Sequence, residues 1–335
     1  MNHLKWAPVI VFAYNRPEHL RRTLQSLMGC TGFSQTPVVV FCDGPKNESD
    51  VSAIHAVQNV IRELLPSQST RVVERKTNLG LAQSVIQGVS QVCAEYGRAI
   101  VIEDDMIVNP AFLLFMNHGL DYYEKEFKVF QVNGFVYDDL SFCKCDVVFL
   151  PFISSWGWAT WHDRWQGFVD DLPKALARGQ AVLSDPGQLQ KFDLDGSFLF
   201  SETLTRRLAG ELDVWAILWY LHVFSNQGLA VYPVQALLLN IGFDGSGTNI
   251  KKPSSPRMRW VGQNAVEPIW IFRKLGAGQA RGQLENQQQV QFDANALNHL
   301  QRFFFKRRRL TNRIYRKMCT KFFEYSAFFN QKEVP

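Results

Sequence analysis

The sequence is short of the features that mark membrane-spanning and secreted proteins. None of its apolar runs approaches the roughly 18 residues that a membrane-spanning helix needs. Its start, Met1 to Trp6, lacks the apolar segment of a signal peptide. The six cysteines among the 335 residues are scattered, and no signal peptide precedes them. We therefore expect a cytoplasmic protein whose thiols are reduced.

Two familiar metal and phosphate motifs are incomplete. Cys143 and Cys145 could start a zinc site, but no second pair of cysteines has zinc spacing, so we do not expect one. The Gly-rich block from Asn240 to Thr248 is not a P-loop, because no Gly-Lys-Ser or Gly-Lys-Thr ends it. It could instead close over a bound ligand as a lid. The chemistry of the chain must therefore be sought in other residues.

Positive charge is concentrated at the C-terminal end. The net charge is only +5, yet nine Lys and Arg and no Asp or Glu lie between Arg302 and Lys321, interleaved with aromatic residues. Such a stretch can bind anionic lipid or nucleic acid, or it can be a solvated terminal helix with an apolar inner stripe. These readings stay open for the tail, and the lipid reading would place 302–329 on the inner face of the plasma membrane. We do not expect nucleic acid as a partner of the remaining chain.

Strand and helix patterns alternate along the first 127 residues. Apolar runs typical of buried strands are Pro8–Tyr14, Pro37–Phe41, Arg71–Glu74 and Arg98–Ile102, and stretches with helical spacing separate them. The hydrophobic fraction of 46% is enough for a sizeable core. The alternation predicts an α/β fold with a doubly wound, mostly parallel sheet that is flanked by helices.

The pattern is less regular after residue 128. Strands are expected at Phe130–Gly134, Val147–Leu150 and, late in the domain, Leu229–Tyr232. Between them we assign an aromatic turn at Ser154–Trp161, a polar region at Asp170–Ser197 and a helix at Asp213–Phe224. We expect one domain over 1–250, with halves of about 1–127 and 128–250. A Pro-, Gly- and Gln-rich linker over 251–292 and a basic aromatic helical tail over 293–335 would follow it.

Three consecutive carboxylates follow the fourth strand-like run. Glu103, Asp104 and Asp105 come directly after Ile102, and Asn109 and Pro110 then open a helix. Three adjacent acids repel one another, and a divalent cation would relieve that cost. Their place after a strand puts them at the carboxyl edge of the sheet, where open α/β sheets bind ligands. The residues therefore predict a cation site, with an acidic helix-entry turn as the alternative.

Six short segments, taken in order, resemble a known enzyme family. They are Ala13-Tyr14-Asn15-Arg16-Pro17, Cys42-Asp43-Gly44, Asn78-Leu79-Gly80-Leu81, Glu103-Asp104-Asp105, Trp156-Gly157-Trp158 with Trp161, and the block from Asn240 to Thr248. Together they resemble inverting nucleotide-sugar glycosyltransferases of the GT-A fold. They are similar to the bacterial transferases that build surface polysaccharides and, more distantly, to the eukaryotic α-mannoside β-1,2-N-acetylglucosaminyltransferase. The resemblance covers about residues 7–249.

The resemblance implies a metal-dependent donor site at the three acids. In such enzymes Mn²⁺ or Mg²⁺ bridges the two phosphates of the nucleotide sugar and stabilises the leaving diphosphate. By this resemblance Asp105 is the metal ligand and Asp104 holds the donor ribose. Glu103 has a supporting part.

The same resemblance assigns nucleotide contacts to segments after the earlier strands. Asp43 is similar to the family carboxylate that accepts the uracil imide N–H, and Arg16 to a donor-binding arginine. Tyr14, Asn78 and Gly80 complete the nucleotide side. From the residues alone, Asp43 could equally be an ordinary turn residue, and Arg16 an exposed residue in a first helical turn.

An inverting transfer also needs a base that deprotonates the acceptor hydroxyl. The resemblance points to Asp213, ahead of an apolar helix. Its segment departs from the family's Trp-Asp-Tyr-Gln pattern, because Leu212 replaces the Trp, and Val214 and Trp215 replace Tyr-Gln. Glu211 is therefore the alternative base. Asp213 could also be an acid that merely favours a helix N-terminus.

The aromatic segment suggests a sugar pocket. Trp156, Trp158 and Trp161 could stack on sugar faces or wall the donor pocket. Gly157 would let the backbone approach a ligand closely. The alternative is a core aromatic cluster.

We therefore expect an enzyme that transfers a hexosyl or N-acetylhexosaminyl group from a nucleotide donor, with UDP favoured, to a polysaccharide or lipid-linked glycan. A sugar nucleotidyltransferase would carry a Gly-rich loop with Arg or Lys after its first strand, which Asn15 to Glu18 fits poorly. A non-catalytic binding protein of this fold would lack the metal acids, and all three are present.

Overall fold

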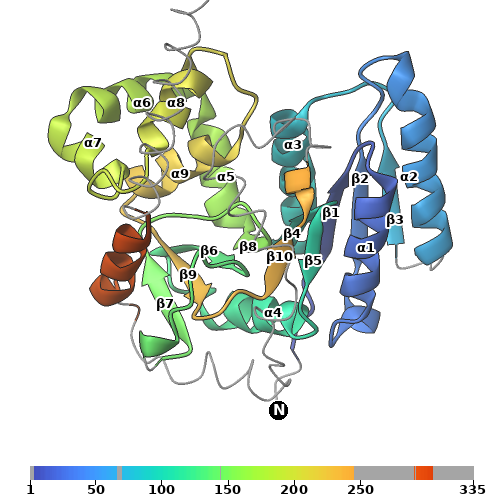
Figure 1. Cartoon of the computed structure of the whole chain (residues 1–335), viewed down its shortest axis with the longest axis horizontal. Coiled ribbons are helices and arrows are strands. Elements are labelled where there is room, and N and C mark those ends of the chain that lie inside the picture. Colours follow the sequence, from blue (N-terminus) through green and yellow to red (C-terminus); the bar gives the residue numbers. More distant parts are fainter. Residues whose placement is uncertain (1–3, 66–69, 144, 245–289, 291, 305–335) are drawn as a thin grey trace, which may run out of the picture.

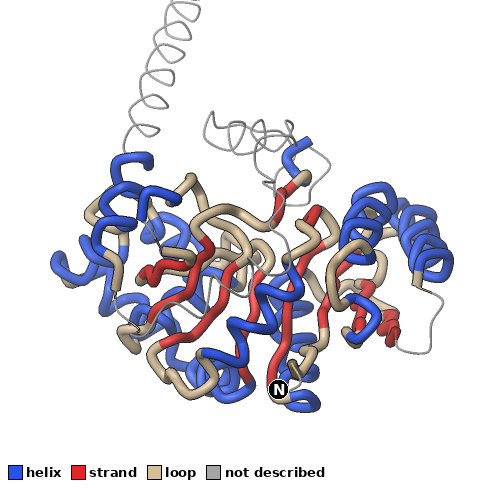
Figure 2. The backbone as a smooth tube through the Cα atoms, turned by 90° about the horizontal axis from the view of Figure 1, so that it is seen from below, coloured by secondary structure: helices blue, strands red, loops and turns tan. Residues whose placement is uncertain are grey.

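The computed structural model describes residues 4–65, 70–143, 145–244, 290 and 292–304. Within them, eight strands form one sheet in the order β3-β2-β1-β4-β8-β6-β9-β7, and two short strands pair separately (Figure 1). The predicted α/β class, with helices flanking a mostly parallel sheet, is confirmed. Helices α6 to α8 and the pair α1 and α2 lie at opposite ends of the molecule in both views (Figure 1, Figure 2).

The first half of the sheet is built from parallel strands. They are β1 (Val9–Ala13), β2 (Val38–Cys42), β3 (Thr70–Glu74) and β4 (Arg98–Glu103), connected in part by α1 (Pro17–Met28), α2 (Val51–Leu64) and α3 (Leu81–Tyr96). Strands β1 and β2 are buried along their whole length, which explains their continuous apolar runs. Helix α1 begins with Pro17, whose fixed φ suits a first helical position.

The second half of the sheet is mixed. Strand β8 (Trp158–Trp161) runs antiparallel between β4 and β6 (Val129–Asn133), while β9 (Leu229–Pro233) is parallel to β6 and antiparallel to β7 (Val147–Leu150). The small sheet pairs β5 (Met106–Val108) with β10 (Leu238–Asn240). The remaining helices are α4 (Phe112–Tyr122), α5 (His162–Asp171), α6 (Ala175–Ser184), α7 (Pro186–Phe192), α8 (Phe200–Leu208) and α9 (Ala216–Ser225).

Two predictions for this half were wrong. The aromatic turn predicted over Ser154–Trp161 contains β8, and the polar region predicted over Asp170–Ser197 contains helices α6 and α7. Residues 294–304 are helical. Most of the predicted linker, the loop residues after Asp244 and the rest of the tail lie outside the described residues. None of the helices that the structure describes is both long and apolar enough to cross a membrane.

Alternate residues of each buried strand feed two separate cores, one on each face of the sheet. Val9 and Val11 point to a core shared with α1, α2 and α4, while Ile10 and Phe12 point to a core shared with α3, α5 and α9. Because both faces are covered, the carboxyl edge of the parallel strands is the exposed place where polar side chains can converge. That edge positions the site described next.

Candidate active site

The three acids lie at the turn between β4 and β5, and helix α1 holds this turn in place. Glu103 ends β4, and the carbonyl of Asp104 accepts a hydrogen bond from Thr23 Oγ1 at 2.7 Å. The amide of Met106 donates to the same hydroxyl at 3.1 Å. From the other side, the Ile241 amide donates to the Asp105 carbonyl at 2.8 Å. The backbone that carries the acids is therefore fixed from two directions.

Arg16 bridges the two aspartates. It directly precedes α1, and its guanidinium donates to Asp104 and lies 2.9 Å from Asp105 Oδ2. The side chains of Asp104 and Asp105 are only 4% and 10% exposed, so this pair is largely shielded from water. Arg16 therefore lies beside the acids, where a donor-binding arginine would be needed, and is not an exposed residue of the first helical turn.

One cation does not balance three carboxylates. Burial, Asp105 and Asp104 together raise the pKa of Glu103 to about 8. Burial raises the pKa of Asp104 to about 6, although Arg16 lowers it. Burial alone would lower the pKa of Arg16, but the charges of Asp104 and Asp105 raise it above its ordinary value. The cluster has an excess of negative charge that a further cation would offset.

Asp105 has an oxygen atom to spare for such a cation. Its Oδ1 is buried and has no hydrogen-bond partner within the described part of the chain. Buried polar atoms are rarely left in this way, and such an atom commonly binds an ion or a water molecule. Carboxylate oxygens are the ligands that Mg²⁺ and Mn²⁺ prefer. The residues present therefore fit a hard divalent cation, to which Asp105 Oδ1 could be offered.

Gly242 packs directly against the ion pair of Arg16 and Asp105. A Cβ atom at this position would lie 2.0 Å from Asp105 Oδ2 and 3.0 Å from Arg16 Nη1. The Gly242 amide donates to Asn240 Oδ1 at 2.8 Å, which ties the turn after β10. From the sequence, the Gly-rich block that contains both residues was expected to close over a ligand, but neither residue was given a role of its own. The one signal that could have found them is their place in the Gly-rich block.

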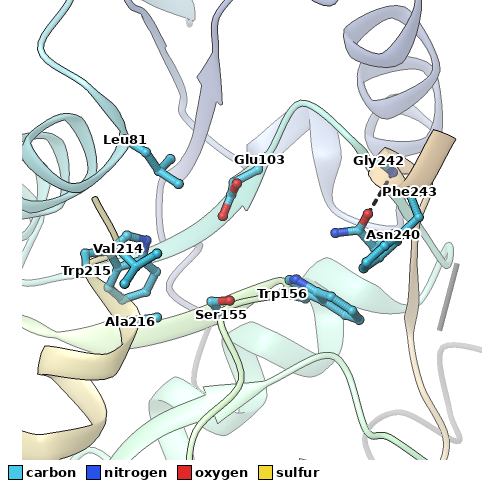
Figure 3. A pocket seen from close by; sticks show the side chains of 10 residues that line it. All are labelled: Leu81, Glu103, Ser155, Trp156, Val214, Trp215, Ala216, Asn240, Gly242 and Phe243. Atoms are coloured by element: carbon cyan, nitrogen blue, oxygen red, sulfur yellow. Dashed lines mark hydrogen bonds between the residues drawn. The ribbon is translucent and has the colours of Figure 1, made fainter. Parts of the chain in front are cut away.

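A cavity of about 200 Å³ adjoins the acids. Its lining comes from both halves of the chain, namely Leu81, Glu103, Ser155, Trp156, Val214, Trp215, Ala216, Asn240, Gly242 and Phe243 (Figure 3). Glu103 points into the cavity from β4, opposite Ser155 and Trp156. The Trp156 ring packs edge-on against Phe243, with 5.5 Å between centroids. A small polar ligand could thus meet a carboxyl group on one side and an aromatic face on the other.

The three predicted pocket tryptophans have different environments. Trp156 lines the cavity, whereas Trp158 and Trp161 are 1% and 2% exposed and belong to the two cores. For Trp158 and Trp161 the structure corresponds to the alternative, a core aromatic cluster. Gly157 has φ of +55° and leaves no room for a side chain beside Leu238, so its backbone conformation serves packing.

Asp43 organises the turn that precedes α3. Its carboxylate accepts hydrogen bonds from the amides of Gly44, Leu79 and Gly80, at 3.0 to 3.2 Å. Asn78 Nδ2 donates to the Gly44 carbonyl at 3.0 Å. Asp43, Asn78 and Gly80 are therefore brought together as predicted, in a turn whose shape depends on Asp43. Tyr14 lies beside the loop that follows Gly44, where its hydroxyl accepts the Lys46 amide at 3.1 Å. Its hydroxyl donates to Asp50 at 2.6 Å, and burial followed by this bond raises its pKa to about 12.

Asp213 lies at the N-terminus of α3, beside the same turn. Its Oδ2 accepts the Ala82 amide at 3.4 Å, and a Cβ on Gly80 would lie 2.6 Å from it. Asp213 is exposed, and its neighbour Val214 lines the cavity. Glu211, the alternative base, is also exposed and pairs with Arg206 at 3.1 Å. Of the two acids, Asp213 is the one in contact with the elements that form the site.

Comparisons with known proteins match glycosyltransferase structures at low similarity. No model of a known protein family matches the chain. The matching solved structures include S. aureus TarS, at 18% identity over 38% of this chain and a TM-score of 0.27. They also include the galactosyltransferase LgtC in complex with donor and acceptor sugar analogs, at 10% identity, 67% of this chain, 72% of that chain and a TM-score of 0.34. An active-site mutant of LgtC matches at 10% identity over 76% of this chain and 95% of that chain, with a TM-score of 0.32. The chain spans about a fifth of TarS (21%).

Proposed function

We propose that this protein is a metal-dependent, inverting glycosyltransferase that moves a sugar from a UDP donor to a glycan. The observation that carries the proposal is the buried Oδ1 of Asp105, which has no hydrogen-bond partner among the described residues. It lies within a cluster of three carboxylates, beside a cavity. An enzyme that releases a nucleoside diphosphate needs a cation at this place, next to a pocket for the sugar. The six sequence segments that resemble such enzymes support the same assignment.

Each residue of the site has a proposed part in donor binding. Asp105 would hold Mn²⁺ or Mg²⁺, which supplies charge stabilisation to the leaving diphosphate. Asp104 would accept hydrogen bonds from the ribose, and Arg16 would turn from the aspartates toward a phosphate. The turn that Asp43 organises would receive the base, with Asp43 as acceptor of the uracil N–H. Trp156 offers its ring to the sugar.

Asp213 is the proposed general base. The acceptor hydroxyl attacks the anomeric carbon as the bond to the diphosphate breaks, and its proton passes to the Asp213 carboxylate. Glu211 stays the alternative. From the resemblance, the acceptor is a surface polysaccharide or a lipid-linked glycan. In that case the tail, 302–329, would contact the inner face of the plasma membrane.

A donor panel tests the proposal. Purified protein with Mn²⁺ is incubated with UDP-, GDP- and CMP-sugars, and sugar release and thermal shift are measured. We expect release from a UDP-sugar, which the Asp105→Asn variant should lose and the Asp170→Asn variant should keep. Asp170 is an exposed aspartate on α5 and serves as a control for the chemical change. No release and no donor-dependent thermal shift with any UDP-sugar would refute the proposal.

A further inference from the structure

A second group of ligand-type side chains lies beside β7, the edge strand of the sheet. Cys143 ends a 3-10 helix, Ser141–Cys143, just ahead of β7, and Cys145 follows two residues later. Asp293 reaches the same place from the start of the helix over 294–304. One ligand atom from each of the three residues lies within 4.8 Å of the others. Strand β7 is separated from β4 by β8, β6 and β9, so this group is distinct from the candidate active site.

Backbone hydrogen bonds fix two of the three residues, Cys143 and Asp293. The Cys143 amide donates to the Leu140 carbonyl at 2.9 Å, and the Asp293 amide donates to the Phe149 carbonyl at 3.1 Å. Asp293 Oδ1 accepts the Ala296 amide at 2.8 Å, as an N-cap of the following helix. This bond orients the Asp293 carboxylate and leaves its second oxygen for a further partner. The convergence is therefore a property of the fold and not of freely rotating surface chains.

The chemistry of the group selects the cation. Two thiols and a carboxyl group this close together repel one another when all three are ionised. A positive charge among them relieves that repulsion. Sulfur ligands favour zinc over Mg²⁺ or Ca²⁺, and zinc accepts a mixed set of sulfur and oxygen. Zinc–ligand bonds of roughly 2.0–2.3 Å place the ligand atoms of a tetrahedral site roughly 3–4 Å apart. Small side-chain rotations would bring these three atoms to that spacing.

A cavity next to the group leaves room for a fourth ligand. It measures about 500 Å³ and is lined by Phe142, Cys143, Asp293, Asn295, Asn298, His299 and Arg302. His299 Nε2 lies 3.1 Å from Asp138 Oδ2, which fixes the imidazole at the cavity wall. A site with three protein ligands and a position that faces a cavity is completed by a water molecule.

We propose that Cys143, Cys145 and Asp293 bind a zinc ion, with water in the fourth position. Each thiol releases its proton to solvent on binding, so that the ion is held by two thiolates and a carboxylate. The ion would fasten the helix over 294–304 to the segment before β7. This helix also packs through Phe304 on Tyr137, with 5.3 Å between ring centroids, so the metal would add to an existing contact.

Cobalt substitution tests this proposal. Full-length reduced protein is titrated with Co²⁺, and we expect a thiolate-to-cobalt charge-transfer band with the strong visible bands of a tetrahedral centre, both lost on adding Zn²⁺. Cys143→Ser and Cys145→Ser should each lose the charge-transfer band. Asp105→Asn should keep it, which separates this site from the candidate active site. Cys30→Ser, at a buried thiol elsewhere in the sheet core, should keep it also.

Two results would overturn the proposal. One is a wild-type titration without a thiolate-to-cobalt band. The other is a Cys143→Ser variant with a native circular dichroism spectrum and an unchanged band. If Cys143→Ser loses both the band and the native spectrum, Asp293→Asn decides the question, because this variant keeps both thiols. It should shift the visible bands and weaken Co²⁺ binding at least tenfold. Unchanged bands and affinity in that variant would also contradict the assignment.

Discussion

Replacing Gly242 by alanine is the sharpest perturbation of the proposed metal site. The new Cβ would lie 2.0 Å from Asp105 Oδ2 and 2.8 Å from Asp105 Cγ. Real Cβ atoms essentially never approach a neighbour within 3.0 Å, so the carboxylate or the turn after β10 must shift by at least 1.0 Å, the difference between 3.0 and 2.0 Å. Because φ of Gly242 is not positive, the effect is steric and carries no backbone penalty.

The expected cost follows from that displacement. Overpacking a close contact costs about 1–3 kcal/mol, so a modest loss of stability is expected. The effect on activity should be larger, because a misplacement of about 1 Å at a reacting site can lower rates roughly 100-fold. Since the displaced group is the proposed metal ligand, the loss should appear mainly as a lower apparent affinity for Mn²⁺.

The assay is sugar release from a UDP donor over a range of Mn²⁺ concentrations, with the melting temperature measured in parallel. Gly167→Ala is the matched control, because Gly167 lies inside α5 and its Cβ would meet nothing closer than 3.8 Å. It should keep full activity and gain up to about 1 kcal/mol of helix stability. If Gly242→Ala is folded and keeps wild-type activity and Mn²⁺ affinity, Asp105 is not the metal ligand.

Three further variants probe the same edge of the sheet. Arg16→Gln removes the cation between Asp104 and Asp105, so we expect the free energy of unfolding to fall by about 3 kcal/mol. Added Mn²⁺ should restore part of this loss, as measured by thermal unfolding with and without the metal. An equal loss in both conditions would contradict this. Asp213→Asn should keep donor binding while transfer falls by about 100-fold or more, measured by calorimetry and product formation; weaker donor binding with normal turnover would refute the base assignment. Gly80→Ala should impair transfer more than Gly196→Ala in the same product assay. Both glycines have positive φ, but only at Gly80 would a Cβ meet a neighbour, Asp213. Equal effects of the two substitutions would exclude a role of that contact in transfer.

The parallel half of the fold could be predicted because its signals are local. Strand β1 was predicted over Pro8–Tyr14 and spans Val9–Ala13, since a continuous apolar run between a proline and a polar cap has few other readings. Strand β8 could not be predicted, because its pairing partners β4 and β6 define it and it directly follows the turn-like segment Ser154–Gly157. Helix α6 was missed for another reason. Only Gly179 and Val182 of α6 are buried, and Ala175 and Leu183 are half-buried beside them, so its apolar stripe is narrow and includes a glycine.

The candidate site divides in the same way. Arg16 and Asp105 follow β1 and β4, which are neighbouring parallel strands, so their meeting could be predicted from strand order alone. Gly242 reaches Asp105 only because β10 pairs with β5 over a separation of at least 130 residues. Asp293 reaches Cys143 by a similar long-range contact. No local pattern encodes such contacts, which depend on how the second half of the chain packs against the first.

One turn connects the two proposed halves of the chemistry. The Gly80 amide donates to Asp43 in the turn assigned to the nucleotide, and the Gly80 backbone also lies against Asp213, the proposed base. Helix α3 starts at the next residue and directs its N-terminus at Asp213. A nucleotide that shifts the turn would therefore shift Asp213 with it, because Gly80 has no side chain to absorb the movement. If Asp213 is the base, as proposed, donor binding would help to set its position, and the acceptor would be deprotonated only where a donor is bound to transfer its sugar.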